Sequence, residues 1–223
     1  MSIFLIILKQ EFTLAGTNLA KIFQNFLFFF ISFAVFFLIS QNQQSQILSP
    51  YLTIDAILFC LIFSLIFSNG DFLFEDFSDG TLEQIIISQP NLEIFVLAKI
   101  LGNWLIFSLP ILISIPLISI GIGLNQNFIT DFFILTTLAS LTINFICAFC
   151  GSLSIAQNKA PMIAVLALPL IIPVLLIACG SFSTTGISDE DFRSALKILL
   201  GICVFVGSIC VLGTTKIIKI VSE

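Results

Sequence analysis

The sequence has little charge and no histidine. Only 9% of its 223 residues are charged, whereas 58% are hydrophobic and 26 are phenylalanine. The mean hydropathy of +1.18 is far above that of a soluble domain. This composition excludes a soluble globular protein and indicates an integral membrane protein.

Two further absences limit the chemistry that the chain can perform. The pattern GxxxxGK[ST] does not occur, so the chain cannot hold nucleotide phosphates in a P-loop. Cys147 and Cys150 form a CxxC pair, but a zinc ion needs two more ligands, and no histidine can supply them. The apolar segments contain no cluster of catalytic polar residues. We therefore expect no enzyme, no bound metal and no nucleic-acid partner.

The six cysteines lie in apolar segments. A disulfide framework of the kind found in secreted domains is therefore not expected. We interpret these residues as small buried hydrophobic side chains.

Apolar segments long enough to cross a membrane take up more than half of the chain. A helix needs about 20 residues to span the roughly 30 Å of hydrocarbon in a bilayer. We therefore predict an all-α, polytopic membrane protein with six transmembrane helices in a single permease domain over residues 1–223. The predicted spans are 22–40, 51–68, 97–121, 132–155, 161–181 and 195–215.

The positions of the basic residues predict the orientation of the spans. Lysine and arginine are enriched in cytoplasmic loops, whereas acidic residues have little influence. With both termini in the cytoplasm, six basic residues lie inside, and only Arg193 and Lys197 lie outside. The six are Lys9, Lys21, Lys99, Lys159, Lys216 and Lys219.

The segment before the first span has the pattern of an amphipathic helix. Its apolar face is predicted to contain Phe4, Ile7, Leu8, Phe12 and Ala15, with the charged residues elsewhere. Such a helix is typical of one that lies in the plane of the membrane interface. The alternative is a plain extension of the first span.

A few polar residues interrupt the predicted spans. Asp55 lies about one turn inside the second span, and it is either part of a substrate or proton path or wetted at the outer interface. Asn103, Trp104 and Asn144 can help helices to pack or can face a cavity. Together these four residues are the candidate polar site within the membrane.

Another candidate site consists of prolines in two spans. Pro110 and Pro116 lie in the third span, and Pro169 and Pro173 in the fifth. Each proline removes a backbone donor and clashes with the carbonyl four residues earlier. Because Pro169 and Pro173 are four residues apart, both defects are expected on one face, with a bend. That bend is either static or flexes during transport.

The loop between the second and third spans concentrates negative charge ahead of a short amphipathic pattern. Its carboxylates are Glu75, Asp76, Asp79 and Glu83. Gly80 permits a sharp turn, and a helix of about two turns is predicted to follow it.

The apolar side of this helix includes Leu82, Ile85 and Ile86. So short a helix is marginal in water, so we expect the membrane surface or another protein to bury this side. Because the carboxylates are repelled by an anionic membrane, the pattern favours docking on a cytoplasmic protein with a basic rim. The alternative is a solvated acidic loop.

Three segments occur in a characteristic order. They are DGTLEQ at residues 79–84, LAKILGNWLIFSLPILISIP at 97–116 and LPLIIPVLLIA at 168–178. Each segment is weak alone, but their order and spacing resemble the haem exporter B family over nearly the whole chain. Members of that family are the membrane permease of the cytochrome c maturation ABC transporter.

This resemblance implies a function and a set of partners. Asp79, Gly80, Leu82 and Glu83 would belong to a coupling helix that fits into a separate cytoplasmic ATPase subunit, which binds the ATP. The other implied partners are a haem-handling membrane protein and an outer-facing haem chaperone. The implied location is a bacterial or mitochondrial inner membrane.

Haem is the cargo that the resemblance implies, but the sequence offers few ligands for haem iron. The family often has histidine before the tryptophan of the third span, where this chain has Asn103, and Met162 is the one methionine beyond the start. We therefore expect an iron-ligating site on a partner. Alternative functions are an ABC permease that exports a lipid or drug, and a scaffold that transports nothing.

Overall fold

The computed structural model describes residues 3–17, 19–41, 50–69, 73, 76–77, 79–88, 91–121, 126–156, 162–180 and 189–222. Within these ranges every regular element is a helix, which confirms the predicted all-α class. The elements are α1 (Ile3–Thr17), α2 (Leu19–Gln41), α3 (Pro50–Ser68), α5 (Thr81–Ser88), α6 (Leu92–Gly121), α7 (Gln126–Ala156), α8 (Met162–Gly180) and α9 (Asp189–Ser222).

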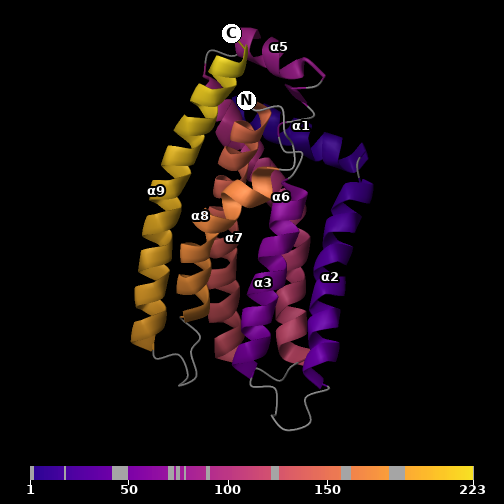
Figure 1. Ribbon diagram of the computed structural model, residues 1–223, viewed down its shortest axis with the longest axis vertical. Coiled ribbons are helices and arrows are strands. Elements are labelled where there is room, and N and C mark those ends of the chain that lie inside the picture. The colour runs from indigo at the N-terminus through magenta and orange to yellow at the C-terminus, as the bar shows by residue number, and fades with distance from the viewer. Residues whose placement is uncertain are drawn as a thin grey trace.

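Six long helices, α2, α3 and α6 to α9, form an elongated bundle (Figure 1). Its centre is α7, which packs against α3, α6, α8 and α9. In the most apolar window of α7, 67% of the residues are buried, whereas the share for α2 is 11%. The central helix is thus enclosed by protein, and α2 lies at the edge.

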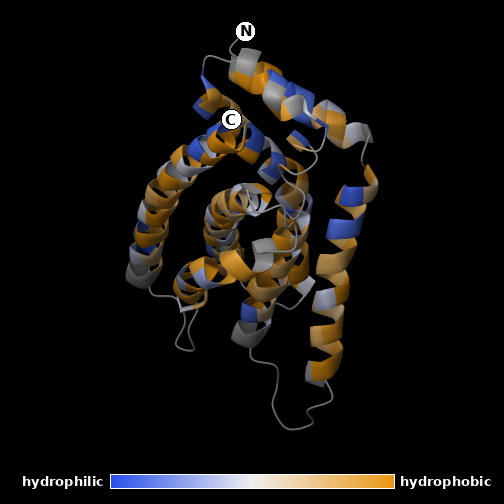
Figure 2. Cartoon of the chain, turned by 45° about the horizontal axis from the view of Figure 1, so that its top comes forward, coloured by the Kyte–Doolittle hydropathy of each residue, from blue (hydrophilic) through white to orange (hydrophobic). Residues whose placement is uncertain are grey.

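The sides of the bundle are predominantly hydrophobic, and hydrophilic residues gather mainly at the end that carries α1 and α5 (Figure 2). Many large apolar side chains face outward, as expected of a surface that contacts lipid. Each of the six predicted spans falls on one helix of the bundle, although α6, α7 and α9 extend beyond the predicted bounds and residues 161 and 181 lie outside the described residues.

In the part of the chain that the structure describes, four helical segments are long and apolar enough to cross a membrane: Leu19–Ile39, Leu92–Gly121, Phe128–Ile155 and Phe192–Val221. The apolar parts of α3 and α8 are shorter, covering Thr53–Ser68 and Val165–Gly180. The count of six spans therefore stays a prediction.

The N-terminal segment forms a separate helix, as its pattern predicts. Figure 1 shows α1 running across the end of the bundle, whereas α2 runs along it. The alternative of a plain extension of the first span is therefore wrong.

The predicted apolar face of α1 coincides only in part with the inner face, which lies against the bundle. Ile7 is buried and Phe4, Leu8 and Ala15 are half-buried, but Phe12 is 47% exposed. The half-buried Glu11 completes the inner face, because it has an ionic partner on α6.

The segment before the sixth span differs from expectation. The motif SDED at residues 188–191 predicts a short external helix that leads toward the span. Instead, α9 is one continuous helix of 34 residues that begins at Asp189. Residues 192–200 contain neither glycine nor proline to interrupt it.

Candidate functional site at the loop end of the bundle

The short helix predicted after the acidic loop is present as α5. Gly80, directly before it, has φ of 70°. This left-handed conformation costs glycine little and most other residues more, so glycine suits the turn. The Gly80 N–H donates a hydrogen bond to the Phe77 carbonyl at 3.3 Å, which closes the turn. The sequence therefore predicts both the helix and the turn that begins it.

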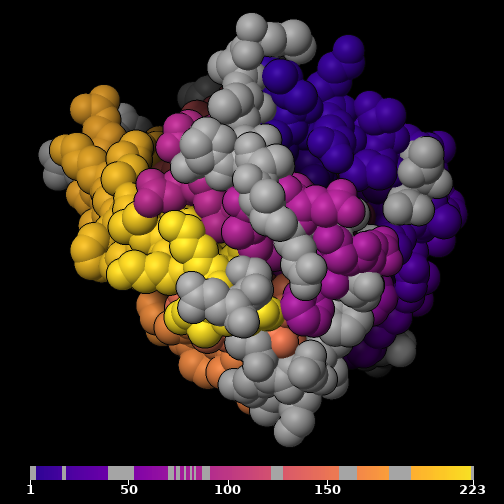
Figure 3. Space-filling view, turned by 90° about the horizontal axis from the view of Figure 1, so that it is seen from above, coloured from indigo at the N-terminus to yellow at the C-terminus, as the bar shows by residue number. Residues whose placement is uncertain are grey.

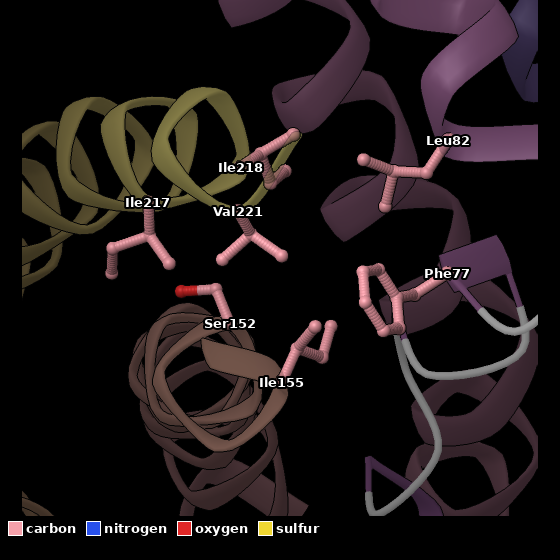
Figure 4. Close-up of a pocket in the computed structure, with 7 residues that line it drawn as sticks. All are labelled: Phe77, Leu82, Ser152, Ile155, Ile217, Ile218 and Val221. Atoms are coloured by element: carbon pink, nitrogen blue, oxygen red, sulfur yellow. The ribbon is translucent and has the colours of Figure 1, made fainter. Parts of the chain in front are cut away.

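The apolar side of α5 packs against the chain itself. Leu82 is only 4% exposed, and with Phe77 it lines an apolar pocket against Ile155 of α7 and Ile218 and Val221 of α9 (Figure 4). The inference that the membrane or another protein must bury Leu82 is therefore wrong.

The other apolar residues of α5 are less enclosed. Ile85 and Ile86 are half-buried on the same hydrophobic cluster as Leu82. The ends of α7 and α9 supply the surface that a two-turn helix needs.

The four loop carboxylates do not share one environment. Asp79 is exposed, whereas Asp76 is half-buried and forms an ion pair with Lys99. Asp76 thus makes an internal contact instead of lying on an external rim. Glu75 lies outside the described residues, as does the side chain of Glu83, whose backbone belongs to α5.

Lys99 is a functional candidate that the sequence does not reveal. It is 7% exposed, and its Nζ lies 3.1 Å from Oε1 of Glu11 while also pairing with Asp76. Sequence reasoning treats it as a basic residue that marks the cytoplasmic side. The apolar run LAKIL around Lys99 could have indicated that this lysine is buried. A buried lysine needs an anionic partner.

Two of the predicted intramembrane polar residues join a buried asparagine cluster. Nδ2 of Asn103 donates to Oδ1 of Asn69 at 2.8 Å and to Oδ1 of Asn144 at 3.4 Å. Nδ2 of Asn144 donates to the Ile100 carbonyl at 2.9 Å. This cluster links α6 and α7 with the end of α3, which supports a role in helix packing.

Trp104, the next residue on α6, makes a hydrogen bond outside the asparagine cluster. Its Nε1–H donates to Oγ of Ser140 on α7 at 3.0 Å.

Asp55 lies apart from these residues. It is exposed on α3, and it precedes Asn69 by 14 positions, or about 21 Å of helix. The four predicted polar residues therefore do not form one site.

The sequence did not predict a second polar contact, which joins α2 and α3. Oγ of Ser64 donates to Oδ1 of Asn25 at 2.6 Å, and Nδ2 of Asn25 donates to the Phe107 carbonyl on α6 at 3.4 Å. These partners are far apart in sequence, so no local pattern predicts the contact.

The prolines lie inside continuous helices. α6 continues through Pro110 and Pro116, and α8 continues through Pro169 and Pro173. Pro169 and Pro173 are both exposed, which agrees with the prediction that they share one face. Whether they bend the helix during a transport cycle remains a hypothesis.

The described residues include no group of three or more cysteine, aspartate or glutamate side chains suited to holding a metal ion. Cys147 and Cys150 are free and buried in α7.

The candidate site is therefore the end of the bundle where α5, α1 and the C-terminal end of α9 meet. Figure 3 shows these segments side by side on one face. The family model described as "CcmB protein" matches residues 2–220 of this chain. The chain belongs to the CcmB family.

This chain has relatives in several bacteria, and these relatives are named "Heme exporter protein B". The Pseudomonas aeruginosa protein is 30% identical over 187 residues, which cover 82% of each chain. The Haemophilus influenzae protein is 27% identical over 191 residues, which cover 83% of this chain and 84% of the relative. These matches and the apolar helices identify a multi-pass membrane protein.

Proposed function

We propose that the chain is the membrane subunit of an ABC-type haem-export complex in cytochrome c maturation, and that α5 couples it to a separate ATPase subunit. Membership of the CcmB family and the relatives' name, "Heme exporter protein B", support the assignment to a haem-export complex. The observation that carries the coupling role is the position of α5: its Leu82 is wedged against the ends of α7 and α9.

The contacts of α5 provide a mechanical route from the loop to the spans. A force on α5 reaches α7 through Ile155 and α9 through Ile218 and Val221, because these residues belong to the same hydrophobic cluster as Leu82. It reaches α6 through the pair of Asp76 with Lys99. Because packed interiors resist compression, these contacts transmit displacement to the helices instead of absorbing it.

The exposed part of α5 and its loop is the proposed docking surface for the ATPase subunit. Asp79 and Gln84 are exposed there, and a basic rim on the partner would complement Asp79. The chain itself is proposed to be non-catalytic, with ATP bound and hydrolysed by the partner.

The proposed orientation places α5 and both termini in the cytoplasm, with the spans in an inner membrane. Figure 1 shows both termini at the same end of the bundle as α5. Lys9, Lys216 and Lys219 lie in α1 and near the end of α9, in agreement with the excess of basic residues expected in the cytoplasm.

The further proposed partners are a haem-handling membrane subunit and a haem chaperone. Haem is proposed as the cargo of the complex, with its iron ligated on a partner. This subunit is proposed to couple ATP hydrolysis by the partner to haem delivery or to release of the haem-loaded chaperone. Export of a lipid or drug, and a scaffold without transport, are the competing functions.

Charge reversal at Asp79 tests the docking surface. Asp79→Lys places a cation opposite the proposed basic rim, so recovery of the ATPase subunit with the chain should fall about tenfold, as expected when like charges meet at an interface. Glu93→Lys is the matched control, because Glu93 is exposed on the first turn of α6 outside the loop. Equal recovery with both variants contradicts docking through this surface.

A further inference from the structure

One buried ammonium group joins three parts of the chain. Among the described residues, Lys99 is the one charged residue classed as buried, and it pairs with both Glu11 and Asp76. Glu11 belongs to α1 and lies 88 positions before Lys99, whereas Asp76 belongs to the acidic loop. The N-terminal helix, the loop and α6 therefore meet at Lys99.

The structure also provides space for Glu11. A Cβ added to Gly102 would lie 3.2 Å from Cβ of Glu11 and 3.3 Å from its Cγ. Gly102 follows Lys99 by three positions, so both residues lie on the same side of α6. Gly102 thus leaves room for the side chain of Glu11 where α1 crosses α6, and Lys99 supplies the positive charge that pairs with Glu11.

The balance of charge makes Lys99 the critical member of the group. With all three residues ionised, one ammonium group is shared between two carboxylates. Removing either carboxylate leaves Lys99 paired with the other, whereas removing Lys99 takes this cation from both half-buried carboxylates at once. Loss of one partner of a buried ion pair costs much more than loss of a surface pair.

We infer that Lys99 is a positioning residue, which holds the acidic loop and its helix α5 against α1 and α6 so that loop and N-terminal helix move together. This inference rests on the proposed function, because α5 is the helix on which the ATPase subunit is proposed to act. Lys99 itself is too enclosed to meet that partner, so it acts through Asp76.

Hydrogen exchange on the full chain in lipid nanodiscs tests the positioning role without any partner. In Lys99→Gln the backbone amides of α5 should exchange at least about tenfold faster, because the loop loses its ionic anchor and opens locally. The amides of α7 should stay protected. Lys99→Arg keeps the charge and should stay within about twofold of the parent.

Two further variants isolate the cause. Lys216→Gln removes an exposed lysine from α9 near the same end of the bundle and should leave α5 unchanged. Asp76→Asn removes the loop's own member and should accelerate exchange in α5. It supplies the test if Lys99→Gln does not fold.

Unchanged exchange of α5 in both Lys99→Gln and Asp76→Asn overturns the inference, and so does equal acceleration in Lys99→Arg. Neither result bears on docking, which the comparison of Asp79→Lys with Glu93→Lys decides separately.

The assembled complex provides a second readout, which a purely structural role would not change. Lys99→Gln should still bind the ATPase subunit and allow ATP hydrolysis, but the yield of cytochrome c per ATP consumed should fall about tenfold as coupling is lost. A normal yield per ATP with a loosened α5 contradicts the positioning role.

Discussion

The bundle contains two hydrophobic clusters that are held together differently. The first, where α2, α3, α6, α7 and α8 meet, contains Phe29, Leu65 and Phe132 and is joined mainly by apolar packing, with the neutral hydrogen bond of Ser64 to Asn25 beside it. The second, at the loop end, contains Ile7, Leu82 and other residues from α1, α5, α6, α7 and α9. Beside this second cluster lies the ion-paired Lys99.

This difference indicates that the two clusters have different roles. Apolar packing is non-directional and stabilises the fold as a whole. The contacts of Lys99 are directional and select one position for the loop relative to α1 and α6. Substitutions in the first cluster should therefore change global stability, and those at the loop end should mainly change the position of α5.

The largest expected effect comes from Leu65→Ala in the first cluster. Leu65 is fully buried, so this change should lower the free energy of unfolding by about 2–5 kcal/mol, through lost burial and a cavity. Thermal denaturation in detergent measures it.

Leu82→Ala is the matched change at the loop end. It should leave the midpoint of span unfolding nearly unchanged and accelerate hydrogen exchange in α5. An equal loss of global stability in the two variants would remove the distinction between the clusters.

An intermediate effect on the free energy of unfolding is expected from a substitution where α7 and α9 cross. A Cβ at Gly213 would lie 2.6 Å from Cε2 of Phe149, so Gly213→Ala must displace a rigid ring, at a cost of about 1–3 kcal/mol. Phe149→Leu in the same chain should recover part of this loss.

Gly201→Ala is the control for this crossing, because nothing lies within 4 Å of the added atom, and it should be neutral or stabilising. A similar melting temperature for Gly213→Ala and Gly201→Ala would show that the close approach is unimportant.

The smallest effect is expected in the asparagine cluster. Asn103→Ala removes the donor to Asn69, and hydrogen bonds between membrane helices contribute only about 0.6 kcal/mol on average. A double-mutant cycle with Asn69→Ala should give a coupling energy of about that size. Strict additivity would show that the bond contributes nothing.

Features set by local sequence were predictable. Apolar length predicted the positions of the six bundle helices, and the glycine and capping pattern predicted α5 with its turn at Gly80. The spacing of Pro169 and Pro173 predicted their common face, because helical periodicity alone determines it.

Features set by how helices cross were not predictable from local patterns. Glu11 meets Lys99 only because α1 folds back across α6 at Gly102. Leu82 is buried only because α7 and α9 end beside the loop. Asn69 joins Asn103 across 34 positions of chain. The sequence therefore indicated where charge and turns lie, but not which partners they meet.

The central claim, that α5 is where an ATPase subunit acts, is tested most directly by photo-crosslinking in the assembled complex. A photoreactive residue in place of Gln84, exposed on α5, is compared with one in place of Arg193, exposed near the start of α9 at the opposite end. We predict a covalent adduct with the ATPase subunit from position 84 and none from position 193. An adduct from position 193, or none from either, would contradict the account.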